Sequence, residues 1–129
     1  MSARLLCAIA SVFFLAIGMC AQQGESRIYS NVEYNEEGGD LLGVEFRVIT
    51  NGSHVTGQLK IYEGGCASPV EMSGSLTGGK LDVTGKNDTY GKIELAGDIR
   101  NEKIEGTLRL EKSEKPEKVQ LKKILKPHC

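Results

Sequence analysis

The chain has 129 residues, with 16 Lys and Arg against 17 Asp and Glu, and a formal net charge of −1. A charge this close to zero creates no strong field for nucleic acid or a membrane surface, so neither is expected as a partner. Behind the N-terminal segment about 107 residues remain, which is enough for one hydrophobic core and too few for two domains.

Residues 1–21 have the layout of a secretory signal peptide. One basic residue, Arg4, precedes an almost continuous apolar run over residues 5–17, and small residues follow it. The run is too short to cross a bilayer as a helix, which needs roughly 20 residues. We therefore expect cleavage, export to the periplasm or the medium, and a mature domain over 22–129 with no integral membrane span.

Cys20 offers an alternative to cleavage and release. It could be the acylated first residue of a lipoprotein, which would anchor the mature domain. This reading is less favoured, because Met19 stands where such sites require a small residue.

Alternation of apolar and polar side chains runs through most of the mature part and is typical of half-buried strands. The first predicted strand covers 27–35, with Ile28 and Val32 on one face and Tyr29 on the other. The second covers 42–48. On it, the side chains expected to face inward are Leu42, Val44, Phe46 and Val48, and those expected to face outward are Gly43, Glu45 and Arg47. Asn51-Gly52 then predicts a tight hairpin turn into a third strand over 54–61.

Two similar hairpins follow at an offset of 23 residues, over 72–83 and 95–106. A last strand is predicted over 118–125, with Val119 and Leu121 inward. Glycines fall on the inward register at positions 57, 74, 97 and 106. Because a missing side chain lets a strand bend sharply, this placement favours a sheet that curls.

These elements predict an all-β fold, an antiparallel meander of about eight strands. Such a meander forms either a small barrel or a sandwich. The barrel is favoured because closure removes the two edges whose unpaired backbone groups invite aggregation.

Cys66 and Cys129 are the two cysteines of the mature part and are predicted to form a disulfide. The bridge would close a loop of about 62 residues, worth roughly 4 kcal/mol in the chain-entropy model. A reactive thiol at Cys66, or a metal site using His128 and Cys129, is the alternative, with too few ligands nearby to be favoured.

Catalytic patterns are weak. His54 is expected to face outward, His128 lies near the end of the sequence, and neither has a serine in a glycine-rich elbow. Glu36, Glu37 and Asp40 sit in a Glu-Glu-Gly-Gly-Asp segment that we interpret as a solvated turn, with a cation site or a glycosidase-like carboxylate pair as alternatives. The sequence predicts no catalytic residue, no metal site and no cofactor.

The string Tyr29-Ser30-Asn31-Val32-Glu33-Tyr34, followed by Glu36-Glu37-Gly38-Gly39-Asp40-Leu41, resembles the opening of a family of small exported bacterial proteins. The resemblance covers most of the mature chain through short motifs. It implies bacterial export and a β-rich domain, and it supplies no catalytic residue. Cys66 and the Lys-Pro-His-Cys ending depart from that family.

Tyrosines supply rigid amphipathic contact area in binding surfaces. A candidate interaction patch therefore consists of Tyr29, Tyr34, Glu36, Glu37, Asp40, Tyr62 and Tyr90. Packing of the tyrosines over the rim of the fold is the alternative interpretation.

The prediction for function is a non-enzymatic β-domain that binds a protein partner. A lipocalin-like binder of a small apolar ligand is the first alternative, less favoured because such a pocket needs a wide, aromatic-lined interior. A hydrolase using the acidic residues is the second.

Overall fold

The computed structural model describes residues 25–129. The predicted signal peptide over 1–21 and the lipoprotein alternative at Cys20 lie outside these residues. Every regular element of the described part is a strand: β1 (Ser26–Ser30), β2 (Glu33–Asn35), β3 (Asp40–Asn51), β4 (His54–Gly64), β5 (Val70–Thr77), β6 (Lys80–Asn87), β7 (Gly91–Arg100), β8 (Lys103–Leu110) and β9 (Glu117–Ile124).

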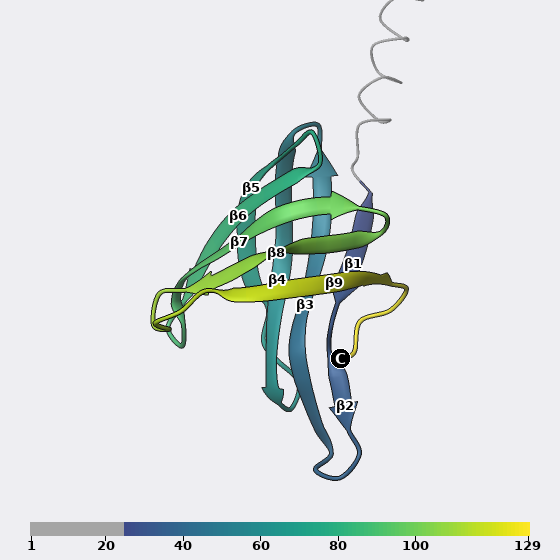
Figure 1. Cartoon of the computed structure of the whole chain (residues 1–129), viewed down its shortest axis with the longest axis vertical. Helices are drawn as coiled ribbons and strands as arrows, with labels where there is room; N and C mark the ends of the chain where they lie inside the picture. Colours follow the sequence, from purple (N-terminus) through teal and green to yellow (C-terminus); the bar gives the residue numbers. More distant parts are fainter. Residues whose placement is uncertain (1–24) are drawn as a thin grey trace, which may run out of the picture.

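The strands form a closed barrel (Figure 1). From β3 to β9 each strand pairs with the next in antiparallel fashion, and β1 pairs with both β9 and β3, which closes the ring. Eight strands make the barrel, and the short β2 pairs with β3 beyond its rim. The predicted all-β meander is confirmed, and closure into a barrel replaces the sandwich alternative.

The first predicted strand, 27–35, is divided into β1 and β2. Both pair with β3 in one continuous register, with Ser30 opposite Glu45 and Glu33 opposite Leu42. Tyr29 lies opposite Phe46 and is 1% exposed, so it belongs to the barrel interior. Register with the neighbouring strand decides which face is buried.

Side chains of every barrel strand fill the interior. Those fully buried include Tyr29, Phe46, Leu59, Leu81, Ile93, Leu95, Ile104 and Leu121. Gly57 makes room for this packing, since a Cβ at that position would lie 2.8 Å from Cε2 of Phe46. The inward glycines therefore let a narrow barrel close around a few large side chains, as the sequence predicts.

The chain continues past β9 as an irregular segment, residues 125–129, which we call the strap (Figure 1, yellow end). The strap runs over the outer side of β3, where His128 meets Glu45, whose neighbours Val44 and Phe46 belong to the core. It ends in the predicted disulfide between Cys129 and Cys66.

Candidate functional site

The strongest candidate for a binding surface is the β2–β3 hairpin, residues 31–44, which extends below the barrel in Figure 1. Asn31 shapes its base. The N–H of Asn31 donates to the oxygen of Val44 at 3.0 Å, and the N–H of Val44 donates to Oδ1 of Asn31 at 2.7 Å. Gly43 has φ +134° there, and a Cβ on it would lie 2.8 Å from Cα of Val32. Only glycine fits this close approach.

The tip of the hairpin is a turn held by Asn35. Its Oδ1 accepts hydrogen bonds from the N–H groups of Glu37 and Gly38, at 3.1 and 3.4 Å. Its backbone oxygen accepts from the N–H of Gly39, whose φ is +71°. Asn and Gly are the residues that this kind of turn selects.

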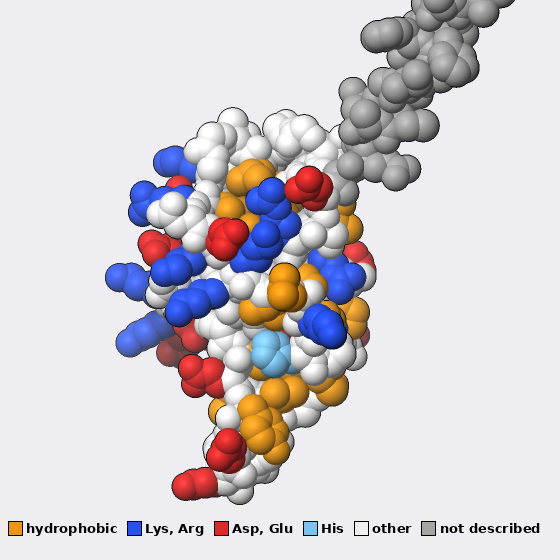
Figure 2. Space-filling model, turned by 90° about the vertical axis from the view of Figure 1, so that its right-hand side faces the viewer, with side chains coloured by type: hydrophobic (Ala, Val, Ile, Leu, Met, Phe, Trp, Pro, Cys, Tyr) orange, Lys and Arg blue, Asp and Glu red, His pale blue; other side chains and the backbone are white. Residues whose placement is uncertain are grey.

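The hairpin combines exposed apolar side chains with negative charge. Tyr34 is 62% exposed and Leu42 is 48% exposed, and both line an open hollow of about 480 Å³. Glu33 also lines this hollow, Glu36, Glu37 and Asp40 lie in or beside the turn at the tip of the hairpin, and residues 28–46 contain no Lys or Arg. In Figure 2 the lower end of the molecule shows red and orange side chains with no blue among them.

The predicted interaction patch is only partly brought together. Tyr34, Glu36, Glu37 and Asp40 are exposed on this one hairpin. Tyr29 and Tyr62 are 1% and 2% exposed, so they lie outside any binding surface of this state. Residue type alone groups them with Tyr34, and burial separates them.

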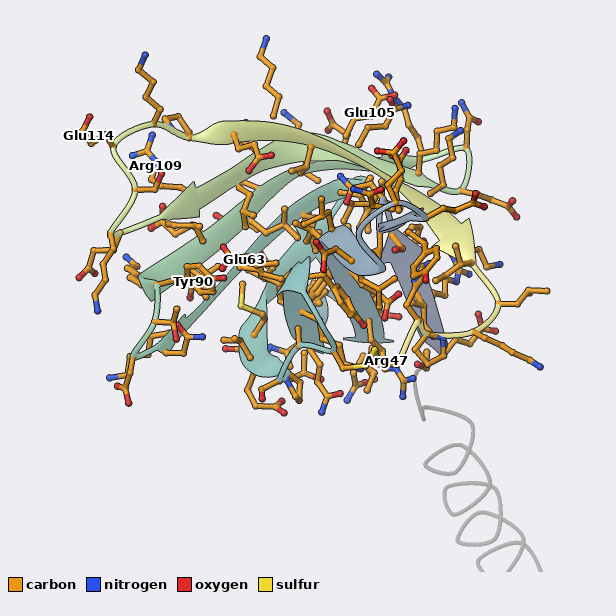
Figure 3. The ribbon with its side chains drawn as sticks, turned by 90° about the horizontal axis from the view of Figure 1, so that it is seen from below. Arg47, Glu63, Tyr90, Glu105, Arg109 and Glu114 are labelled. Atoms are coloured by element: carbon orange, nitrogen blue, oxygen red, sulfur yellow. A yellow bond between two sulfur atoms is a disulfide. The ribbon has the colours of Figure 1, made fainter. Side chains whose placement is uncertain are left out.

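Tyr90 takes the rim position that was the alternative interpretation. It packs against the core at the turn between β6 and β7. Figure 3, which looks at the barrel from below, shows Tyr90 and Glu63 close together. Burial raises the pKa of Tyr90 to about 12, and the neighbouring Glu63 carboxylate is the second cause of this shift.

A second cluster, absent from the sequence-based predictions, lies beneath the strap. The Glu45 side chain is 4% exposed although its register points it away from the core. It accepts hydrogen bonds from Nδ1 of His128 at 2.7 Å, from the His128 backbone N–H at 3.3 Å and from the Tyr62 hydroxyl at 3.3 Å. These three donors satisfy a carboxylate that burial would otherwise destabilise.

Tyr62 completes this cluster. Its ring meets the His128 ring edge-on, with centroids 6.3 Å apart. Burial, followed by the charge of Glu45, raises the pKa of Tyr62 above the ordinary 10.0. The predicted disulfide was the available signal for this cluster, because it brings His128 next to the end of β4.

The arrangement carries little catalytic chemistry. Glu36, Glu37 and Asp40 are exposed, whereas a general acid needs a carboxyl group in a protected cleft. His128 has an orienting carboxylate in Glu45, but within residues 25–129 its hydrogen bonds go only to that residue. No group of three or more metal-ligating side chains occurs in the described part of the chain.

Among residues 25–129, packed core side chains occupy the barrel interior. At the end of the barrel near Tyr29, a hollow of about 120 Å³ is lined by Val48, Leu76 and Ile99 among others. Ligand pockets usually measure roughly 300–1,000 Å³. A wider open hollow of about 710 Å³ lies at the β6–β7 turn, where its lining includes Lys86, Asp88 and Lys92.

Comparisons with known proteins found no matching family model, curated protein or solved structure. None of the elements within residues 25–129 is a helix long and apolar enough to span a membrane.

Proposed function

We propose that this protein is an exported, non-enzymatic domain that binds a protein partner through the β2–β3 hairpin. The observation that carries the proposal is the exposure of Tyr34 and Leu42 on the two faces of one hairpin at the projecting end of the molecule. Large apolar side chains held in water contribute little to folding, and such patches commonly mark interaction sites. Tyrosine is also one of the residue types that typically dominate binding energy.

The charge of the hairpin indicates the chemistry of the partner. Four exposed acidic residues lie on the hairpin, and no Lys or Arg of residues 28–46 balances them. A partner with a positively charged rim around an apolar contact would complement this surface. Association should then slow as salt is added, because screening weakens long-range attraction.

Export is supported by two independent features. The signal-peptide pattern of residues 1–21 is one. The other is the disulfide between Cys66 and Cys129, since disulfides persist mainly in oxidising compartments. The resemblance at Tyr29–Leu41 suggests a bacterial envelope or the medium as the location.

The alternatives have weaker support. A small apolar ligand would need interior volume that the packed side chains of the core occupy. A hydrolase would need a protected acid, and the acidic residues of the hairpin tip are exposed.

Affinity capture from the native envelope tests the proposal, using wild type and a Tyr34→Ala/Leu42→Ser variant. Ile49→Thr is the matched control, because Ile49 is also an exposed apolar residue of β3, at the opposite end of the strand. We expect a protein captured by wild type and Ile49→Thr and lost with the hairpin variant. Equal capture by all three would contradict the proposal.

A further inference from the structure

We propose that the strap, residues 125–129, is a cover released by thiol–disulfide exchange, and that its release enlarges the binding surface of the β2–β3 hairpin. The second half of this inference rests on the proposed function. The first half concerns the barrel and strap alone and is testable without any partner.

The strap buries what would otherwise be an open face of the sheet. Glu45 and Tyr62 are placed by β3 and β4 with their side chains outward, yet both are almost fully buried. What covers them is His128 and the end of the strap, whose Cys129 also accepts a hydrogen bond from Lys60 Nζ at 3.4 Å. Removing the strap therefore exposes a carboxylate and an aromatic ring together.

The rest of the strap is loosely held. Leu125 is 93% exposed, and Lys126 and Pro127 are exposed as well. Beneath Pro127 a gap of about 20 Å³ remains, lined by Glu45, Arg47 and Lys60 among others. Within residues 25–129 the strap is held by contacts with Glu45, Tyr62 and Lys60 and by one covalent bond, so its closed position depends strongly on that bond.

The disulfide is accessible for exchange, because Cys66 and Cys129 are both exposed residues. Exposed disulfides are the labile and regulatory ones. A thiolate of a protein dithiol attacks one sulfur, forms a mixed disulfide and displaces the other cysteine as a thiolate. The second thiol of the reductant, as a thiolate, then attacks the reductant's own sulfur in the mixed disulfide and displaces the remaining cysteine of this protein as a thiolate. Cys66 and Cys129 end as thiols after protonation by solvent, and the reductant, having given two electrons, ends as a disulfide.

The exposed face would extend the hairpin surface. Tyr62 lies opposite Gly43 of the hairpin in the β3–β4 register, and Glu45 lies two residues further along β3. The opened state thus adds one tyrosine and one carboxylate to the acidic, tyrosine-containing surface around Tyr34. A basic partner should bind this state more tightly than the closed one.

Nitration of tyrosines, read residue by residue in a peptide map, tests the release. We compare oxidised wild type with the Cys66→Ser/Cys129→Ser variant. Nitration of Tyr62 should become at least roughly tenfold faster in the variant, as expected for local opening. Exposed Tyr34 should react in both proteins and interior Tyr29 in neither. Protection of Tyr62 in both would show that the strap stays closed without its disulfide, and would overturn the inference.

A second measurement covers the case in which the variant folds poorly. Amide hydrogen exchange of wild type is followed before and after dithiothreitol. After reduction the His128 N–H, donated to Glu45, should exchange almost as fast as an unprotected amide, while the Leu95 N–H in the barrel should keep the protection that the stability of the reduced barrel gives it. Equal protection of both amides after reduction would mean that the strap opens only when the barrel unfolds, and would overturn the inference.

Partner capture separates the two proposals. Tighter capture by the double serine variant than by oxidised wild type supports the proposal that release of the strap enlarges the binding surface. Equal capture of a partner by the two proteins is consistent with binding through the hairpin, but it contradicts any effect of the strap on that binding. If the strap is released but neither protein captures a partner, binding through the hairpin and its regulation by the strap are both contradicted. The release of the strap by thiol–disulfide exchange would still be supported.

Discussion

Nδ1 of His128 lies 2.7 Å from Oε1 of Glu45, although 83 residues separate the two in the sequence. The contact joins the strap to the outer side of β3 and buries the carboxylate. A glutamate on the outer face of a barrel strand normally remains in water. Here hydrogen bonds from the protein replace those from water. Losing one donor therefore leaves the buried carboxylate with too few hydrogen bonds.

Replacing His128 should therefore cost stability. We expect His128→Ala to lower the free energy of unfolding by about 1–3 kcal/mol, the usual effect of depriving a buried polar group of its partner. His54→Ala is the matched control, because His54 is exposed at the start of β4. Urea denaturation of both variants checks this, and equal midpoints would show that the Glu45–His128 pair contributes nothing.

Loss of the disulfide should have a larger effect. Cys66 and Cys129 are 63 residues apart, and a loop of that length is worth roughly 4 kcal/mol in the chain-entropy model. The Cys66→Ser/Cys129→Ser variant should still form the barrel, because the core residues do not involve the strap. Urea unfolding with and without dithiothreitol measures the difference in wild type, and an unchanged midpoint would contradict the prediction.

How far the sequence predicts this molecule differs between the barrel and the site. Alternation and turn residues are local signals, so Phe46, Val48 and the Asn51-Gly52 turn are predicted correctly. Closure between β1 and β3 could only be favoured over a sandwich, because pairing across the ring depends on the curvature of the whole sheet.

The site is harder to predict for a physical reason. Alternation assigns Glu45 to the outer face, and an outer face is assumed to meet water. Only a segment that packs against the outside of the sheet can bury Glu45, and the alternation of apolar and polar residues does not predict where such a segment packs. Burial likewise separates Tyr34 from Tyr29, which composition alone treats as equivalent.

A substitution in the turn between β7 and β8 should raise the stability of the protein. Asn101 and Glu102 have φ of 52° and 61°, in the left-handed region. At the corresponding turn between β5 and β6, Gly78 and Gly79 take positive φ without a side chain. Glu102→Gly should stabilise the protein by about 1 kcal/mol through relief of backbone strain. The lost contact with Lys123, 3.9 Å and exposed, is worth little. Thermal unfolding checks the sign, and a lower midpoint would contradict it.

Gly57 should not tolerate even one methyl group. An alanine there would press on Phe46 and on the backbone oxygen of Arg47, neither of which can move freely inside a closed barrel. We expect Gly57→Ala to cost about 1–3 kcal/mol, as overpacking does elsewhere. Gly65→Ala is the control, since a Cβ at Gly65 meets nothing within 4 Å. Urea unfolding of the two variants should separate them clearly, and equal losses would refute the packing argument.

Tyr90 should make the barrel sensitive to alkaline pH. Its pKa is about 12 in the folded protein, raised by burial and then by Glu63, against an ordinary value of 10.0 in an unfolded chain. The folded state therefore holds the proton where the unfolded state releases it. This contribution to stability is complete below pH 10 and is lost as the pH rises toward 12.

Glu63→Gln separates the two causes of that shift. Removing the carboxylate should lower the pKa of Tyr90 toward 10, while burial keeps it above that value, because burial is the larger cause. Tyrosinate absorbance during an alkaline titration measures the change, with Tyr90→Phe identifying which step belongs to Tyr90. If the Tyr90 step does not move in Glu63→Gln, the carboxylate plays no part in holding its proton.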